Sequence, residues 1–467
     1  MENERSVAET AAGENEGAGI DLSVRAVSGG YLAALLLGSY LSALLFYLEL
    51  DAAGAAAFAL SWIGLPFLAM RDRIVFDGRR LARTGILFNV IRRLSGRRTR
   101  LRLGDVEQID TQATRTLRRD GRVHYRYRTT VRGLGLAYAF SSASASYPEM
   151  LARLLAELPD EVMDLRTLDM RTYLGDPKEI QMKASFAGIP GSDVLESSLR
   201  SAPRRNRSAI DTGDIPDDES NKADYLHRLG NELRVAGFLI QSIEAFRRAL
   251  HLRPRDPRIL LDLARGMHSY AGSERSEKLR MRSIAALRLS SRYAGEDAGL
   301  IARIGEAFSQ FGRWRLAESA FRRAIERGGN CFLAFRGLAE TAMREGKLAH
   351  VIHQFDAANI AAGSNALRRW AGGEAAYFAR LNSDDEFLEM ESSRVQLADS
   401  LGRFARSGFF AAAAGALPLL YGLIFDETLA ANVGWAVTGL GLAVWIALLA
   451  GSTFFEQRFP HDIELDD

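Results

Sequence analysis

Few residues of this sequence have the types and spacing that metal binding or covalent catalysis requires. His350 and His353 lie three positions apart, a spacing that allows two imidazoles to share a metal ion, although a packed or exposed pair is the more common arrangement. Cys331 is the only cysteine, and a catalytic thiol needs a histidine base that the sequence does not place. No phosphate-binding glycine loop, nucleophile elbow or kinase signature is present. We therefore expect neither an enzyme nor a metal or cofactor site.

A cluster of basic residues offers binding chemistry instead. The cluster consists of Arg92, Arg93, Arg97, Arg98 and Arg100. Arginines next to a membrane can bind anionic lipid headgroups, at about 1 kcal/mol per residue. Alternatively, they only fix the orientation of neighbouring membrane helices, which is the more common role. The segment has no nucleic-acid-binding motif, so we expect no nucleic-acid partner.

Four apolar segments have the length of membrane-spanning helices. Residues 31–48 and 52–70 form one closely spaced pair, and residues 408–425 and 429–455 form a second. About 20 apolar residues in a helix cross the hydrocarbon core of a bilayer. The four apolar cores contain no ionisable residue, which argues against a pore or a pump. The sequence therefore predicts two transmembrane hairpins, and their similar Gly- and Ala-rich faces predict that the hairpins pack together.

The charges around these segments predict their orientation. Residues 71–102 hold eleven arginines and two aspartates, Arg403 and Arg406 precede the third segment, and neither hairpin turn holds a basic residue. Basic residues that flank membrane helices stay in the cytoplasm. We expect a multi-pass protein of the bacterial inner (cytoplasmic) membrane, with its soluble domains and both termini in the cytoplasm. The polar tail before the first segment argues against a cleaved signal peptide.

Residues 73–158 have the pattern of short strands followed by one helix. Asp77-Gly78 and Asp120-Gly121 are turn signals between alternating segments, and an apolar stripe at helical spacing follows Pro148. The order of these elements, directly after a two-span hairpin, resembles the bacterial pleckstrin-homology-like membrane domains. The resemblance lies in the segments DRIVFDGRRLAR, RTRLRLGDVEQIDT and YPEMLARLLAEL. It implies a small β-barrel with one helix that is used for binding.

A repeat of three residue types follows. The recurring residues are Gly237, Gly312 and Gly346, Phe246, Phe321 and Phe355, and Ala249, Ala324 and Ala358. The second and third copies are 34 residues apart, whereas the first and second are 75 apart, which is two periods plus seven. An expanded repeat should therefore fill residues 257–297, and residues 366–400 should form a degenerate last repeat or a cap.

This pattern resembles the tetratricopeptide repeat over about 150 residues. In that family each repeat is a pair of antiparallel helices, so the resemblance implies an all-α solenoid. The family's small residue at the helix crossing corresponds to Gly230, Gly305 and Ala339, and its glycine ends the first helix. The aromatic residue and the alanine pack the second helix against its neighbour.

The first helices of such an array line a concave groove that binds proteins in this family. Counting from each repeat start places seven polar residues in the groove: His227, Asn231, Arg234, Arg303, Glu306, Arg336 and Glu340. A basic, amide-bearing groove can receive an extended acidic peptide or a carboxylate terminus. For any single residue, a solvated position is the more common alternative.

The sequence thus predicts a multi-domain membrane protein with two transmembrane helical hairpins, a small β-barrel/α domain and an all-α solenoid. The predicted order is an acidic disordered tail at 1–27, a hairpin at 28–70, the pleckstrin-homology-like domain at 71–170, a flexible linker at 171–222, the repeats at 223–400, a hairpin at 401–455 and an acidic tail at 456–467.

Two functions fit this organisation. The first is a membrane-anchored scaffold or adaptor that recruits or assembles a protein complex at the cytoplasmic face through its repeats. The second is a non-enzymatic component of envelope biogenesis or transport that acts on lipid or substrate through the membrane helices and the pleckstrin-homology-like domain. The lack of ionisable residues in the apolar cores favours the first.

Overall fold

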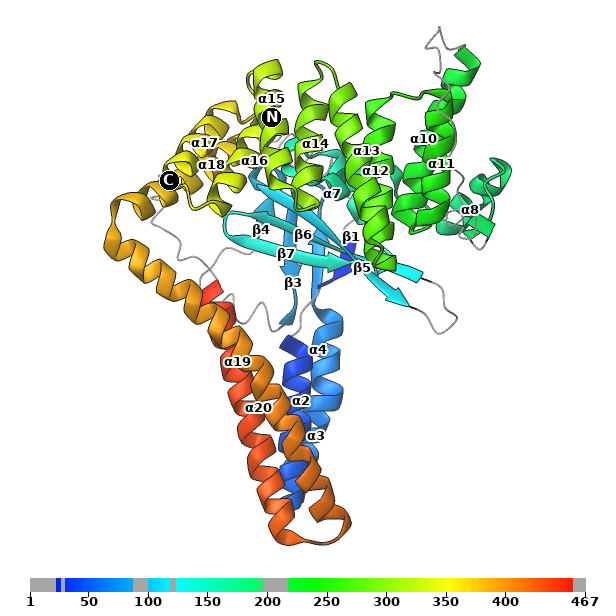
Figure 1. The fold of residues 1–467 in the computed structure, drawn as a ribbon. Helices are drawn as coiled ribbons and strands as arrows, with labels where there is room; N and C mark the ends of the chain where they lie inside the picture. Colours follow the sequence, from blue (N-terminus) through cyan, green and yellow to red (C-terminus); the bar gives the residue numbers. More distant parts are fainter. Residues whose placement is uncertain are drawn as a thin grey trace, which may run out of the picture. The chain divides into compact units, whose positions relative to one another are not determined.

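A computed structural model describes residues 22–26, 30–86, 100–117, 123–192, 194–195 and 217–456. The chain divides into two compact units. The sheet-and-repeat unit comprises Met1–Val24, Val75–Ala82 and Arg100–Ala379, and the long-helix unit comprises Arg25–Ile74, Arg83–Thr99 and Arg380–Asp467. Figure 1 shows the elements of both. Residues 1–21 of the tail predicted at 1–27, residues 457–467 of the tail predicted at 456–467, and residues 196–216 of the predicted linker lie outside the described residues.

Seven strands form two sheets within the described residues. The first has the order β1-β2-β3-β4, made of Leu22–Arg25, Arg73–Phe76, Arg80–Thr84 and Arg100–Arg102. The second is antiparallel with the order β5-β6-β7, made of Gln108–Leu117, Val123–Gly133 and Leu136–Ser141. The described strands therefore form two separate small sheets and not the closed barrel that the sequence predicted.

Strand β1 corrects the prediction that residues 1–27 are disordered throughout. Leu22 and Val24 are buried while Ser23 and Arg25 are not, so the strand has one buried face. Its partner β2 follows the first pair of apolar helices, so two strands far apart in sequence lie side by side. Composition alone did not reveal this strand, because four residues are too few to stand out beside an acidic tail.

Helix α6 (Tyr147–Ala156) follows the strands as predicted. Pro148 lies in its first turn, and Met150, Leu151, Leu154 and Leu155 form its buried stripe. This stripe provides part of the hydrophobic core on which the sheets pack.

Part of the predicted flexible linker is helical. Helix α7 (Leu165–Tyr173) begins inside the predicted strand domain, and α8 (Pro177–Phe186) lies wholly within the predicted linker. Asp176 caps α8 by accepting a hydrogen bond from the Lys178 backbone N–H at 2.9 Å. Ile180 and Ala184 are buried against α10. Two apolar residues four positions apart are enough to dock a short helix, although the composition around them is polar.

Antiparallel helix pairs make up the repeat array. These helices are α10 (Asp217–Ala236), α11 (Leu239–Leu252), α12 (Pro257–Glu274), α13 (Glu277–Tyr293), α14 (Ala298–Gln310), α15 (Trp314–Gly328), α16 (Phe332–Arg344), α17 (Leu348–Ala361) and α18 (Asn365–Ser383). The expanded repeat predicted at 257–297 is confirmed, because α12 has 18 residues where α14 and α16 each have 13.

The recurring residues have the predicted packing roles. A Cβ atom added at Gly230 would lie 2.6 Å from the Phe246 ring, and one added at Gly305 would lie 2.6 Å from the Phe321 ring. The helices of a pair therefore cross at glycine against an aromatic ring in two successive copies of the pattern. Gly312 follows the first helix of its repeat with a φ of +70°, a conformation that favours glycine.

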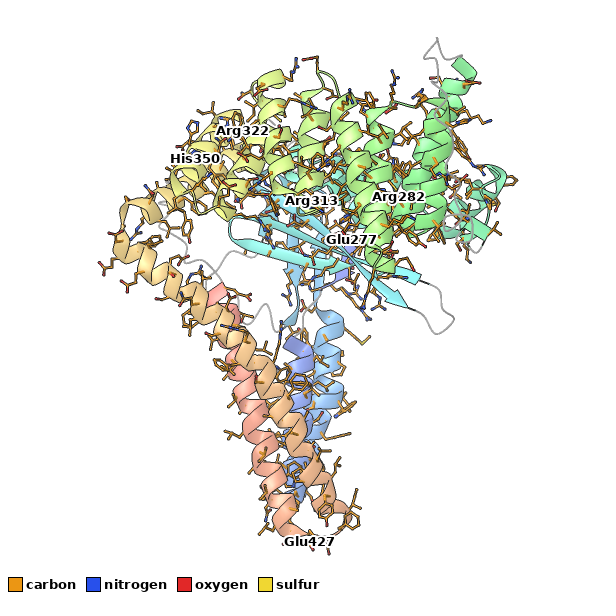
Figure 2. The ribbon with its side chains drawn as sticks, viewed as in Figure 1. Glu277, Arg282, Arg313, Arg322, His350 and Glu427 are labelled. Atoms are coloured by element: carbon orange, nitrogen blue, oxygen red, sulfur yellow. The ribbon has the colours of Figure 1, made fainter. Side chains whose placement is uncertain are left out.

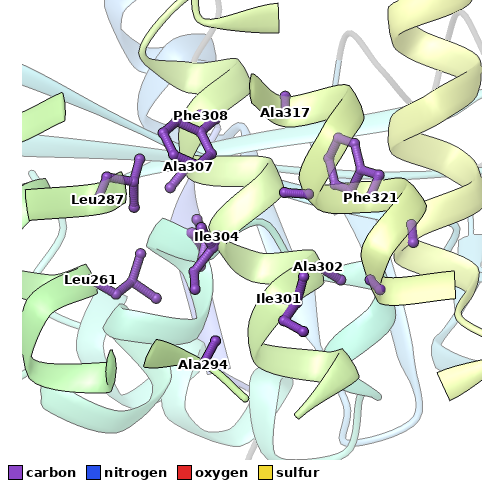
Figure 3. Packing of buried hydrophobic residues seen from close by; sticks show 14 of the residues in the cluster. Leu261, Leu287, Ala294, Ile301, Ala302, Ile304, Ala307, Phe308, Ala317 and Phe321 are labelled. Atoms are coloured by element: carbon purple, nitrogen blue, oxygen red, sulfur yellow. The ribbon is translucent and has the colours of Figure 1, made fainter. Parts of the chain in front are cut away.

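A continuous apolar core joins neighbouring repeats. Leu261, Leu287, Ile304, Phe308 and Phe321 lie together in it, as Figure 3 shows. Each helix pair buries its apolar stripe against the next pair, so the stability of the array comes from contacts between neighbours.

Helix α18 closes the array. Trp370 lies edge-on to Phe355 with ring centroids 5.6 Å apart, and Phe378 stacks on Phe355 at 5.9 Å. The predicted boundary at residue 400 is wrong, because α19 (Asp385–Ile424) runs without interruption from the end of the array into the third apolar segment. No proline precedes Pro418 in this helix, so nothing in the sequence forces it to end earlier.

The long-helix unit contains the four apolar segments. The first pair consists of α2 (Gly30–Tyr47) and a second helix made of α3 (Asp51–Ala59), a π-helical turn (Leu60–Gly64) and α4 (Leu65–Arg71), while the second pair consists of α19 and α20 (Thr428–Glu456). By length and composition all four could cross a membrane. The π-helical turn ends two residues before Pro66, which lies in the first turn of α4.

The two pairs contact each other within this unit, as predicted. The Tyr40 hydroxyl of α2 donates a hydrogen bond to the Trp435 carbonyl of α20 at 2.7 Å, and their rings lie 5.4 Å apart. A Cβ atom added at Gly439 would lie 2.2 Å from the Tyr40 hydroxyl oxygen. Small residues allow this close approach, which is how apolar helices pack in a lipid environment.

We expect Gly305→Ala to lower the stability of the repeat array by about 1–3 kcal/mol, because the added methyl group overpacks the crossing with Phe321. The matched control is Gly373→Ala in α18, where an added Cβ atom meets nothing within 4 Å. Alanine favours a helix over glycine by about 1 kcal/mol, so the control should be neutral or stabilising. Thermal unfolding of the detergent-solubilised chain, followed by circular dichroism, measures both. Equal effects of the two substitutions would contradict the crossing geometry.

Candidate functional site

The seven predicted groove residues lie on the first helices of their repeats, but the groove is not free. His227, Asn231 and Arg234 belong to α10, Arg303 and Glu306 to α14, and Arg336 and Glu340 to α16. Several of them bind residues 159–173 of the same chain, which form a short 3-10 helix (Asp160–Val162) and α7. We call residues 159–173 the internal segment. The prediction of an open groove is therefore wrong for this part of the array.

Asp169 of the internal segment binds two arginines of the array. Arg234 Nη1 donates to Asp169 Oδ2 at 2.8 Å, and Arg265 Nη1 donates to Asp169 Oδ1 at 3.1 Å. All three side chains are nearly buried, with exposed fractions of 8–10%. Burial alone would raise the pKa of Asp169, but the two guanidinium groups outweigh it and lower the pKa below its ordinary value. The carboxylate is therefore ionised and paired.

A second carboxylate, Asp262 of α12, organises the array side of this contact. It accepts hydrogen bonds from His227 Nε2 at 2.8 Å, Asn231 Nδ2 at 2.9 Å and Arg265 Nη1 at 3.1 Å. Burial opposes its charge, whereas the bond from His227 and the charges of Arg234 and Arg265 lower its pKa. Asp262 thus links α10 to α12 and holds the arginines that bind Asp169.

The next inner helix binds the backbone of the internal segment. Arg303 donates to the Met163 carbonyl at 3.1 Å and to the Asp160 carbonyl at 2.8 Å. Glu306 accepts a hydrogen bond at 3.0 Å from the N–H of Leu165, the first residue of α7. An N–H in the first turn of a helix lacks a partner within the helix, so Glu306 satisfies it from another element.

The last two predicted residues contact each other. Arg336 Nε donates to Glu340 Oε1 at 3.0 Å, and the Arg336 guanidinium lies 5.5 Å from the centre of the Trp370 ring. These two side chains thus pair within the array and with its closing helix. Arg369 of α18 also donates a hydrogen bond at 2.6 Å to Asp105, which lies between β4 and β5.

The opposite side of the internal segment is bound to the second sheet. The Thr111 hydroxyl of β5 lies 2.8 Å from the Thr167 hydroxyl of α7 and 3.1 Å from that of Thr129 in β6. Asp164 caps α7 by accepting from the Thr167 N–H at 2.9 Å. Burial raises the pKa of Asp164 to about 6, although the hydrogen bonds from Thr167 oppose that rise.

The internal segment is also part of the hydrophobic core. Val162, Met163, Leu165 and Met170 are at most 5% exposed. A foreign peptide could enter the groove only if these side chains were exposed and the paired charges separated. Both changes are costly, so these residues bind a protein segment that belongs to the chain itself.

Sequence reasoning missed Asp169, Asp262 and Arg265. Asp262 and Arg265 lie three positions apart on the first helix of the expanded repeat, so they share a face with the predicted groove residues. Counting from the start of that repeat could have found them. No sequence signal identifies Asp169, because its partners Arg234 and Arg265 lie 65 and 96 positions away along the chain.

A cleft adjoins this contact. Its volume is about 970 Å³, and its wall includes the turn between α10 and α11 and the first turn of α8. Aromatic side chains from the sheet and the array line it, namely Tyr125, Tyr127, Phe238 and Tyr270. Gln181 and Glu274 are exposed polar residues of its wall.

The remaining predicted sites form no catalytic or metal-binding cluster in the part of the chain that the structure describes. Arg92, Arg93, Arg97 and Arg98 lie outside the described residues, and Arg100 is exposed at the start of β4. His350 and His353 are exposed on α17, where Figure 2 labels His350. Within the described part of the chain, no group of three His, Cys, Asp or Glu side chains could hold a metal ion. Cys331 is half-buried before the first turn of α16.

Comparison with known proteins gives similarities to solved tetratricopeptide repeat structures. MamA is 15% identical, with a TM-score of 0.26, and the match covers 40% of this chain and 95% of MamA. TTC0263, a thermophilic repeat protein from Thermus thermophilus, is 15% identical with a TM-score of 0.28, covering 43% and 98%. YrrB, a repeat protein with an unusual peptide-binding site, is 17% identical with a TM-score of 0.28, covering 38% and 86%.

No protein-family model matches the chain, and no curated protein matches it either. The tetratricopeptide-like architecture therefore rests on the helix pairs of this chain and on the glycine–aromatic crossings within them.

We expect Asp169→Asn to lower the stability of the sheet-and-repeat unit by about 3–5 kcal/mol, because Arg234 and Arg265 would remain buried without a full counter-charge. Hydrogen exchange of residues 159–173 should accelerate in the variant. The control is Asp224→Asn, which removes a 62% exposed partner of Arg253 and should cost at most about 1 kcal/mol. Unchanged exchange in Asp169→Asn would show that the ion pairs do not hold the internal segment.

The raised pKa of Asp164 predicts a pH dependence. The folded state binds this proton more tightly than the unfolded state, so the contribution of Asp164 to stability is fully present below about pH 4 and is lost as the pH rises through about 6. Asp164→Asn keeps the acceptor that caps α7 but does not titrate. The stability of the variant relative to the unsubstituted chain should therefore increase between pH 4 and pH 7 in thermal unfolding. A constant difference across that range would refute a raised pKa.

Proposed function

We propose that this protein is a non-enzymatic scaffold, anchored in the bacterial inner membrane by four helices, whose cytoplasmic sheet-and-repeat unit binds other proteins. The observation that carries the proposal is the way the array holds the internal segment. Arginines of three successive inner helices bind a carboxylate and three backbone carbonyls of that segment. The array thus already recognises a protein segment through side-chain and main-chain groups.

Partner binding is proposed for the cleft and not for the groove, because the internal segment fills the groove. The cleft combines aromatic side chains with exposed polar groups, a composition that is typical of protein-binding surfaces. Its walls come from the sheet, α8 and the array, so a partner seated there would contact all three. A partner that binds in the cleft would be held at the membrane, because the four helices anchor the chain there.

Membrane anchoring is supported by the length and composition of the four helices. The lipid-binding role of the arginine cluster is part of the proposal. Strand β2 starts one residue after Asp72, which follows α4, and the Thr84 hydroxyl at the end of β3 donates to the Arg73 carbonyl. The described chain before Arg92, Arg93, Arg97 and Arg98 therefore passes next to the end of a proposed span, and we propose that these arginines bind lipid headgroups.

The alternative role in envelope biogenesis or transport has less support. Transport across a membrane uses ionisable or polar groups inside the spans, and the four apolar cores contain no ionisable residue.

A photo-crosslinking amino acid at Gln181, on the wall of the cleft, should capture a specific protein in living cells. The same amino acid at Arg322, which lies on α15 and is labelled in Figure 2, is the matched control, because that side chain is exposed and lies outside the cleft. We expect adduct formation to be at least about tenfold greater at Gln181, since a specific contact is concentrated in the core of an interface. Equal capture at both positions, or none, would contradict a partner site in the cleft.

A further inference from the structure

The outer face of the β5-β6-β7 sheet carries three exposed arginines of its central strand. Arg126, Arg128 and Arg132 lie on one face of β6, because alternate residues of a strand point the same way. Thr129 and Val131 lie on the opposite face and are fully buried. We call the surface formed by the three exposed arginines the arginine face.

The neighbours of these arginines are small and mostly uncharged. Across β5, Gln112 is opposite Arg128 and Thr114 is opposite Arg126. Across β7, Ser141 is opposite Arg128 and Ala137 is opposite Arg132. The arginine face is therefore open, with short side chains on both flanks.

One acidic residue of the described strands, Asp110, lies on the arginine face and offsets only part of the charge of the three arginines. Asp110 of β5 lies opposite Thr130 on this face, and its carboxylate accepts hydrogen bonds from the Gln108 amide at 2.9 and 3.0 Å. Among the described residues, none of the salt bridges involves Arg126, Arg128 or Arg132. Three neighbouring cations on one strand repel one another unless an anionic surface lies against them.

We propose that the arginine face docks on the anionic phospholipid headgroups of the membrane that holds the four long helices. The proposal rests on the membrane anchoring inferred above. Charge complementarity supports it, since the cytoplasmic surface of a membrane is negatively charged. The residues paired with Arg126, Arg128 and Arg132 in β5 and β7 have no aromatic side chain on which the bases of a single-stranded nucleic acid could stack.

Each arginine near an anionic membrane strengthens the docking equilibrium about fivefold, so the three together contribute roughly 100-fold. Salt weakens the attraction, because the Debye length is about 8 Å at physiological ionic strength and shorter above it. Docking should therefore depend on lipid charge, on the three arginines and on ionic strength.

The test uses the full chain with Cys331→Ser and a donor fluorophore on Ala137→Cys, an exposed position opposite Arg132. The protein is reconstituted in nanodiscs of phosphatidylcholine, with or without phosphatidylglycerol, that contain a headgroup-labelled acceptor lipid. We expect energy transfer to be greater in the anionic discs and to fall when salt is added. Arg126→Gln, Arg128→Gln and Arg132→Gln together should abolish the difference between the two disc types.

The matched control removes three exposed arginines of α13, by Arg282→Gln, Arg288→Gln and Arg292→Gln, and should keep the difference; Figure 2 labels Arg282. Failure of the chain to incorporate into discs would overturn the anchoring and with it the docking. Incorporation without any dependence on lipid charge would overturn the docking alone. An acidic protein that copurifies in neutral discs and is lost from the arginine-face variant would show that the face binds a protein and not the membrane.

Discussion

The sheet-and-repeat unit depends on one cluster of buried charges. Asp169 and Asp262 each lie between guanidinium groups, and Arg265 bonds to both carboxylates. Buried ion pairs add little stability compared with apolar packing, but removing one partner leaves the other uncompensated at a cost of several kcal/mol. The cluster therefore fixes where the internal segment lies on the array more than it stabilises the fold. In the observed arrangement, helices α7, α10 and α12 meet with these charges paired.

This arrangement changes what the repeats do in this protein. An array of helix pairs offers its inner face to a partner, and here the partner of three inner helices is a segment that is also bonded to the second sheet. Strands and repeats thereby form one unit, although they occupy separate stretches of sequence. Surfaces that remain open for other molecules lie elsewhere, at the aromatic cleft and at the arginine face of the sheet.

Periodicity made much of the fold predictable. Residue spacing predicted the four apolar segments, the helix after Pro148 and the expanded repeat at 257–297. A helix either buries a stripe of apolar side chains or is apolar enough to cross a membrane, and both patterns are visible in the sequence. The crossing of Gly305 against Phe321 agrees with what the resemblance to the tetratricopeptide repeat implied, and the 34-residue and 75-residue spacings carry that resemblance. Short elements were missed: β1 has four residues and α8 docks through two buried side chains, too few for a composition-based signal.

The sequence alone determined which residues face the inner side of the array, because helical spacing fixes the face of each side chain. Asn231, Arg234 and Arg303 lie on the first helices of their repeats. Only the tertiary structure decided what those residues bind, because Asp169 lies 65 positions before Arg234 and 96 before Arg265. Local patterns carry no information about pairing over such distances. A polar helix face can contact solvent, a foreign peptide or another part of the same chain. Which of these it contacts depends on the other buried charges that need a partner, and these come together only when the whole unit folds.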